Sequence, residues 1–252
     1  MSLIMHCGAK PITLRDLQFD PTPPRTRSHV PVPHWDFANR IRGKVPSGYK
    51  IRNEAYGVQG TRFFGVLYID RDDAPNDDYN FVIGMRGCNG KTMKRSIAFG
   101  SHVFVCDNMC FSGNTVVHRK HTAGILRDLD GIIDGVMNQA RTAGHDLDKQ
   151  IAYFKDREMS PSEIHDLSVL CMDEGVLTPR TLKKTLEGYR RPKHEAFLPR
   201  TMWSYLNAVT ESLKPTKQQL DKGRGNFDLH TERTTKLHDL CKSYRGFDYS
   251  RN

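Results

Sequence analysis

The sequence predicts an α+β fold in which an N-terminal antiparallel β-meander packs on a long helix and is followed by a helical C-terminal region. Two observations predict it. Between residues 49 and 117, short runs rich in β-branched and aromatic residues are separated by turn residues, a pattern typical of an antiparallel meander. After His121, apolar residues recur at steps of three and four, which indicates an amphipathic helix. A sheet followed by helices is typical of an α+β protein.

Residues 1–48 are predicted to form a proline-rich N-terminal arm. Proline fixes φ and lacks an N–H group, so this stretch is expected to be extended over the body of the protein, with one short helix at residues 35–42. The prolines that carry this prediction are Pro21, Pro23, Pro24, Pro31, Pro33 and Pro46.

Residues 49–158 are predicted to form the core domain. Its five strands are expected at residues 49–58, 62–69, 79–86, 93–106 and 111–117. Gly60 marks the first turn, and Asn89-Gly90 predicts a tight hairpin at the third, because both residues tolerate positive φ. The connection at residues 70–78 holds five aspartates and a proline. It is interpreted as a solvated acidic turn, because its spacing is not that of a calcium loop.

The long helix is predicted to lay one apolar face across the sheet, with a possible break near Gly144. Its apolar positions are Leu126, Leu129, Ile133, Val136, Ala140, Leu147, Ile151 and Phe154. In the helical region, residues 159–252, Ser160-Pro161-Ser162-Glu163 is a capping-box signature and Thr178-Pro179 opens another helix in a similar way. Further helices are expected at residues 202–213 and 235–244, and a basic glycine-rich loop at residues 222–226.

Charge and composition narrow the class of protein. The 252 residues include 38 Lys and Arg against 29 Asp and Glu, and the net charge of +9 favours a polyanionic partner, although a basic enzyme also fits. No apolar run approaches the ~20 residues that span a bilayer, and the N-terminus lacks a secretory pattern. We therefore expect no membrane partner and a cytoplasmic location. The six cysteines are interpreted as thiols.

Metal, cofactor and catalytic motifs are weak. Cys106, Cys110, His118 and His121 are residue types that suit zinc, but their spacing matches no common finger and Cys106 ends an apolar strand, so core packing is favoured. The segment at residues 87–92 lacks the full phosphate-loop spacing and joins two strands, so it is interpreted as a hairpin turn. We expect no metal site, no cofactor and no catalytic residue, and an enzyme is the less favoured class.

Basic residues gather in three sequence clusters: around the Asn-Gly hairpin, at the start of the long helix, and in the helical region. They are candidate nucleic-acid contacts, and the alternative is that they form ordinary solvated faces. The candidates are Arg86, Lys91, Lys94, Arg95, Arg119, Lys120, His121, Arg180, Lys183, Lys184, Arg190 and Arg191. Aromatic residues near them in sequence are candidate stacking groups for single strands, namely Phe99, Phe111, Tyr189 and Tyr205.

Several motifs are distributed over most of the chain. They are Val30-Pro31-Val32-Pro33-His34, Phe64-Gly65-Val66-Leu67, Ile83-Gly84-Met85-Arg86, Gly100-Ser101-His102-Val103-Phe104-Val105-Cys106-Asp107-Asn108, Arg119-Lys120-His121-Thr122 and Trp203-Ser204-Tyr205-Leu206-Asn207-Ala208-Val209-Thr210-Glu211. In these motifs the chain resembles a phage/plasmid-like family catalogued as domain of unknown function nine-three-two. The resemblance implies a protein of phages, plasmids and related mobile elements, with no established reaction.

The chain departs from that family at one segment. In the family, the residues after Gly-x-Arg are usually Asn-Ser followed by a His-Asp pair, whereas here Gly87-Cys88-Asn89-Gly90 follows. The resemblance therefore implies that the most polar candidate site is removed, together with any activity that depends on it.

The layout also resembles that of ring-forming single-strand annealing proteins, which hold nucleic-acid backbone between a β-hairpin and a helical body. By this analogy, Asp107 and Asn108 form a polar cluster beside the groove together with Arg119, Lys120 and His121. Asp107, Asn108 and His118 are the candidate polar cluster of the family motifs. The alternative is that Asp107 caps a turn and pairs with Arg119.

We therefore expect a mobile-element nucleic-acid-binding protein that prefers single-stranded DNA and acts in recombination, replication or defence evasion. One alternative is a phage-encoded inhibitor that binds a host enzyme or defence protein. Another is an enzyme on nucleic acid that uses Asp107, His118 and His121. Sheet edges must be covered, and a long strand needs several subunits, so we also expect a homo-oligomer in which the arm takes part.

Overall fold

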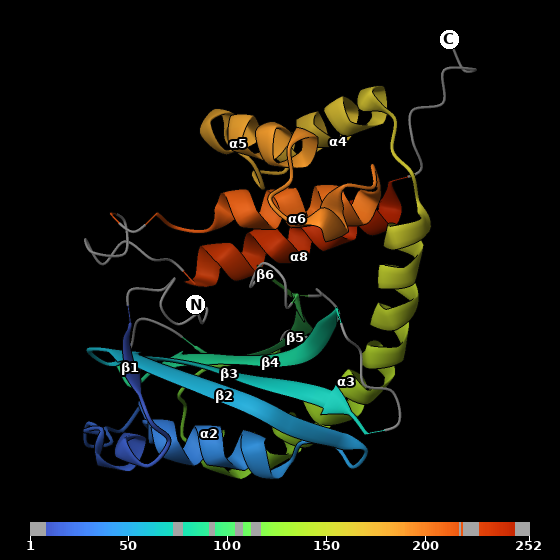
Figure 1. The fold of residues 1–252 in the computed structure, drawn as a ribbon. Coiled ribbons are helices and arrows are strands. Elements are labelled where there is room, and N and C mark those ends of the chain that lie inside the picture. The colour runs from blue at the N-terminus through green and yellow to red at the C-terminus, as the bar shows by residue number, and fades with distance from the viewer. Residues whose placement is uncertain are drawn as a thin grey trace. The chain divides into compact units, whose positions relative to one another are not determined.

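The computed structural model describes residues 9–72, 78–90, 94–103, 108–111, 117–216, 218 and 227–244, and the fold is α+β, as predicted (Figure 1). The chain divides into two compact units. The first comprises residues 1–107, 114–144 and 215–226, and the second comprises residues 108–113, 145–214 and 227–252. Within the described residues, no helix combines the length and the apolar character needed to cross a membrane.

The sheet of the first unit is an antiparallel meander, as predicted. Its long strands are β2 (Tyr49–Gln59), β3 (Arg62–Arg71), β4 (Tyr79–Cys88) and β5 (Arg95–Val103). Each pairs with the next along the chain, and Gly60 makes the first turn with φ of 58°. The predicted strand at residues 111–117 overlaps only the ends of β6 (Asn108–Phe111) and β7 (Val117–Arg119), and β7 pairs with β5.

The connection between β4 and β5 is not the tight two-residue hairpin that Asn89-Gly90 predicts. Strand β4 ends at Cys88 and β5 begins only at Arg95, and Gly90 does not adopt positive φ. The physical reason is that Asn89 is used in the core: its backbone N–H donates to Thr61 O at 2.9 Å and its side chain is buried. A tertiary contact has overridden a local turn signal.

The arm folds onto the sheet of its own chain. Strand β1 (Lys10–Ile12) pairs with the edge of β2, the 3-10 helix η1 (Asp16–Phe19) follows, and α2 (His34–Gly43) confirms the predicted short helix. Val30, Val32 and Phe37 are buried, so the arm contributes to the core. A role for the arm in contacts between subunits stays a prediction.

The long helix α3 (Ile125–Asp156) confirms the predicted amphipathic helix, with two differences. It is continuous through Gly144, so the expected break is absent; a Cβ at this position would lie 2.6 Å from Tyr49 Oη, which explains the glycine. Leu126 is 48% exposed, and Ile125 takes its expected place in the core. A shift of one residue turns a helical side chain by about a quarter of a turn.

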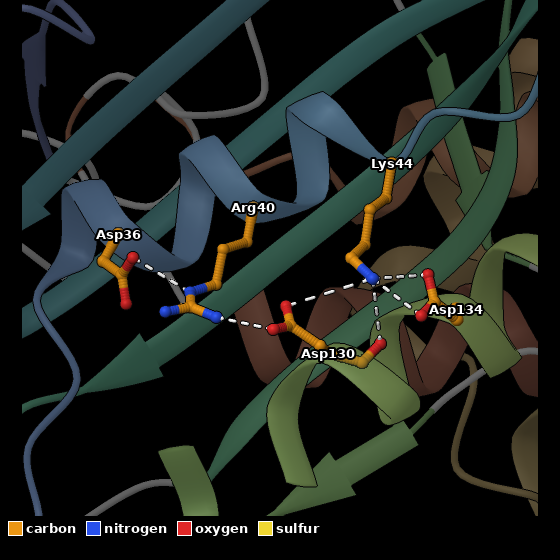
Figure 2. Close-up of polar contacts among 5 residues, drawn as sticks. All are labelled: Asp36, Arg40, Lys44, Asp130 and Asp134. Atoms are coloured by element: carbon orange, nitrogen blue, oxygen red, sulfur yellow. Dashed lines mark hydrogen bonds and ion pairs between the residues drawn. The ribbon is translucent and has the colours of Figure 1, made fainter. Parts of the chain in front are cut away.

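An ion-pair network joins α2 to the N-terminal part of α3 on one face of the sheet, as Figure 2 shows. Arg40 donates to Asp36 Oδ1 at 2.9 Å and to Asp130 Oδ2 at 2.8 Å. Lys44 Nζ donates to Asp134 Oδ1 at 2.6 Å. These contacts hold the helical part of the arm against α3.

The second unit is mainly helical, as predicted. Its elements include α4 (Pro161–Asp173), α5 (Pro179–Arg190), the 3-10 helix η3 (Glu195–Phe197), α6 (Met202–Leu213) and α8 (Phe227–Ser243). Ser160 and Thr178 both form the predicted capping boxes. Helix α6 has the predicted bounds and α8 begins earlier than predicted, at Phe227. Both α5 and α8 pack against α6.

Candidate functional site

Helix α5 presents the third predicted cluster as one exposed basic face. Arg180, Lys183 and Lys184 lie on the same side of the helix and are exposed, and Arg191, also exposed, follows directly after its last residue. Thr185 and Tyr189 lie on the opposite side and are buried. The sequence spacing therefore gives α5 one buried face and one charged face. Arg190 is exposed and lies beside the charged face.

This basic face has few neutralising partners. Residues 179–193 contain six Lys and Arg against one carboxylate, Glu187. Lys183 Nζ lies 4.0 Å from Glu187, and Lys193 Nζ lies 3.8 Å from Glu211. All of these side chains are exposed, and pairs of this kind contribute only about 0 to 1 kcal/mol. The face keeps most of its positive charge available to a polyanion.

Two sets of contacts make α5 a rigid support for these charges. At the N-terminus, Thr178 and Thr181 form a reciprocal capping box. At the C-terminus, the guanidinium of Arg200 donates to the carbonyl oxygens of Tyr189 and, at 2.9 Å, of Arg190. Arg200 Cζ also lies 5.2 Å from the Tyr189 ring centroid. A cation at the carbonyl end of a helix satisfies its unpaired acceptors and its dipole.

The predicted stacking aromatics are not on a surface. Phe99, Tyr189 and Tyr205 are buried, and the side chain of Phe111 is outside the described part of the chain. Tyr189 follows Thr185 by four residues, so it lies on the core face of α5, not on its basic face. The prediction that these aromatics stack on bases is therefore wrong for the three that are described.

The hairpin and helix-start clusters are brought together, and some of their described side chains are buried. Arg95 and Arg119 are register partners of β5 and β7. Arg95 and His121 are buried, so the prediction that they are surface contacts for nucleic acid is wrong, while Lys94 and Lys120 are exposed. Arg86 is only partly exposed, and burial lowers its pKa. Lys91, Cys106 and Asp107 lie outside the described residues, as do the side chains of Asn108, Cys110, His118 and Arg119.

Arg95 is the centre of a buried polar cluster. The side chain is only 2% exposed, and its guanidinium carbon lies 4.8 Å from the Phe37 ring centroid. Nη2 donates to Val32 O, to His34 Nδ1 at 3.0 Å and to Asn89 Oδ1 at 2.8 Å. One guanidinium nitrogen therefore ties the arm to the residues that follow β4.

Two further histidines join this cluster. The backbone N–H of Val30 donates to His121 O at 3.1 Å, and His121 Nδ1 lies 3.3 Å from Val30 O. His29 Nε2 lies 3.0 Å from Asn89 O, and the rings of His29 and His121 are 5.2 Å apart.

Burial and the charge of Arg95 set the protonation of the cluster. Burial first, then Arg95, lowers the pKa of His34 to about 3 and that of His121 to about 4, so both imidazoles are neutral at pH 7. Burial also lowers the pKa of Arg95, to about 9, which leaves the guanidinium charged at pH 7. Among the described residues, no group of three or more His, Cys, Asp or Glu is placed to hold a metal ion.

Comparison with known proteins places the chain in a family. The family model described as Domain of unknown function (DUF932) matches residues 46–240. The chain belongs to the DUF932 family. No curated protein and no solved structure matches the chain.

In this DUF932 protein, sequence motifs far apart in the chain meet at Arg95. The segments at residues 30–34 and 119–122 both contribute to the buried cluster, and so does the segment at residues 87–90. A Cβ at Gly87 would lie 2.8 Å from Arg95 Nη1, so glycine is needed there. This segment is therefore part of a polar site. The motif residues were visible in the sequence, but their meeting point was not.

Proposed function

We propose that this protein binds nucleic acid through the exposed basic face of α5. The observation that carries the proposal is the concentration of six cations against one carboxylate in residues 179–193, four of them on a helix whose opposite face is buried. Cations that replace the counterions of a phosphate backbone are the main source of sequence-independent affinity. In a mobile element, such binding would serve recombination, replication or defence evasion without chemistry of its own.

The proposed mode is backbone binding, with single-stranded DNA as the favoured form. The buried aromatics give no support to base stacking, so the affinity has to come from phosphate contacts. A flexible single strand can adapt its phosphate spacing to cations that are fixed along a helix of 12 residues, about 18 Å long. Assembly into a homo-oligomer would extend such a short contact along a longer strand.

Fluorescence anisotropy with labelled single-stranded and duplex oligonucleotides tests this proposal. The variant Arg180→Ala/Lys183→Ala/Lys184→Ala should bind about tenfold or more weakly, and the slope of log affinity against log salt should fall by about 2, at about 0.7 per lost phosphate contact on a single strand.

The matched control for that experiment removes the same charge from exposed cations of the first unit, Arg25→Ala/Arg27→Ala/Arg62→Ala. It should keep both the affinity and the slope. Equal losses in the two variants would show that only net charge matters. Unchanged binding in the α5 variant would remove α5 from the interface.

A protein-binding inhibitor is the second candidate function. Its supporting observation is that Val169 of α4 and Leu198 are 55% and 57% exposed, since phosphate binding does not require exposed apolar side chains. If no oligonucleotide binds at low salt and the purified protein carries no absorbance from nucleic acid, this alternative replaces the first.

A further inference from the structure

The buried guanidinium of Arg95 forms no ion pair with a carboxylate among the described residues. The three acceptors of Nη2 are the neutral groups Val32 O, His34 Nδ1 and Asn89 Oδ1. Cys88 and, after it, Asp36 favour the charged form of Arg95 electrostatically, and Asp36 is itself bound by Arg40 at 2.9 Å. A buried charge without a close partner of opposite sign is costly, and proteins usually pair it or hydrate it.

Several N–H groups near this charge also lack a hydrogen-bond acceptor among the described residues. Arg95 Nε and Nη1 and Asn89 Nδ2 are buried and have no hydrogen-bond partner among the described residues. Asn89 Nδ2 belongs to the amide group whose oxygen accepts from Arg95, so these donors lie close to the same guanidinium. Buried donors of this kind are rare unless a ligand, ion or water satisfies them.

The neighbouring groups hold the guanidinium ready for a ligand. Phe37 lies against the guanidinium, and Gly87 has no side chain that would displace Arg95. His34 and His121 are neutral at pH 7, so they add no competing charge. Guanidinium groups fixed in this way are the preferred partners of carboxylate and phosphate oxygens.

We propose that Arg95 and Asn89 form a binding site for a phosphate group, either inorganic phosphate or the phosphate of a nucleotide. The anion accepts hydrogen bonds from Arg95 Nη1 or Nε and from Asn89 Nδ2, and it neutralises the buried charge. The site lies in the first unit and is independent of the α5 face. It adds a small-molecule ligand to the proposed nucleic-acid binding.

The experiment is thermal unfolding of the full chain in inorganic phosphate, with sodium chloride adjusted to hold the ionic strength constant, together with calorimetric titration. The wild type should show a saturable rise in Tm and one phosphate bound per chain. AMP in place of phosphate distinguishes the sources: a larger rise with AMP identifies a nucleotide phosphate, and an equal or smaller rise identifies free phosphate.

Two variants decide the location of the site. Asn89→Asp places a carboxylate beside Arg95, so Tm should rise in phosphate-free buffer and the phosphate effect should disappear. Arg95→Met should also abolish the phosphate effect, and Asn89→Asp keeps the proposal testable if that variant does not fold. The α5 triple variant should keep the full phosphate effect, which separates this site from the proposed nucleic-acid interface.

The absence of a phosphate-dependent rise in the wild type would overturn the proposal. A rise of equal size in Asn89→Asp or Arg95→Met would overturn it as well, because phosphate would then act elsewhere on the protein.

Discussion

Replacing Phe37 with alanine is expected to loosen the arm from the sheet. Phe37 is 1% exposed, packs edge-on against Phe63 with ring centroids 6.5 Å apart, and lies under Arg95. A buried phenylalanine removes about 150 to 200 Å² from water, worth about 4 to 5 kcal/mol at about 25 cal/mol per Å². Because alanine keeps part of this burial, we expect Phe37→Ala to lower the free energy of unfolding by about 4 kcal/mol.

Urea unfolding followed by circular dichroism measures this loss, and the arm supplies its own control. Phe19 lies in the same arm but is 78% exposed, so Phe19→Ala should change the free energy of unfolding by no more than about 0.5 kcal/mol. Phe37 packs against residues of its own chain. The decrease in the free energy of unfolding caused by Phe37→Ala should therefore not depend on protein concentration. Similar effects in the two variants, or a loss for Phe37→Ala that appears only above a threshold concentration, would refute the reasoning.

Three further predictions concern local stability. Ser160→Ala removes the acceptor of the Glu163 backbone N–H and should cost about 1 kcal/mol in chemical unfolding. Ser162→Ala, in the same first turn, removes only a hydroxyl 3.1 Å from that of Ser160 and should cost about half of that or less. The lowered pKa values of His34 and His121 mean that the unfolded chain binds more protons between pH 4 and 6.5, so stability should be constant above about pH 6.5 and fall as the pH drops below it. His121→Gln should roughly halve that pH dependence of the urea midpoint, and an unchanged profile would contradict the assignment. Lys44→Ala breaks the contacts with Asp134 and should cost about 0.5 to 1 kcal/mol at low salt, a difference that 1 M sodium chloride should largely remove if it is electrostatic.

Local patterns explain the elements that were predicted correctly. The meander, the long helix and the capping boxes at Ser160 and Thr178 depend on alternation, helical spacing or a side chain three residues from its partner. The basic face of α5 belongs to the same group, because helical spacing alone separates Lys183 and Lys184 from Tyr189.

The failures came where distant segments meet. Asn89-Gly90 has the composition of a tight hairpin, but Asn89 is held by Thr61 and Arg95 and does not form that turn. Strand β1 was missed because three residues, Lys10–Ile12, carry no strand pattern of their own and form a strand only beside β2.

Arg95 shows most clearly what tertiary structure decided. In the sequence it is one of several basic residues around a turn, indistinguishable from exposed Lys94. Arg95 is buried because the arm packs over the first residue of β5. Val32 and His34 of the arm both accept hydrogen bonds from it. The sequence by itself determined most of the longer elements and the charge of this protein, because these follow from neighbouring residues. Which charges face solvent and which are enclosed was decided only by contacts between residues about 60 positions apart.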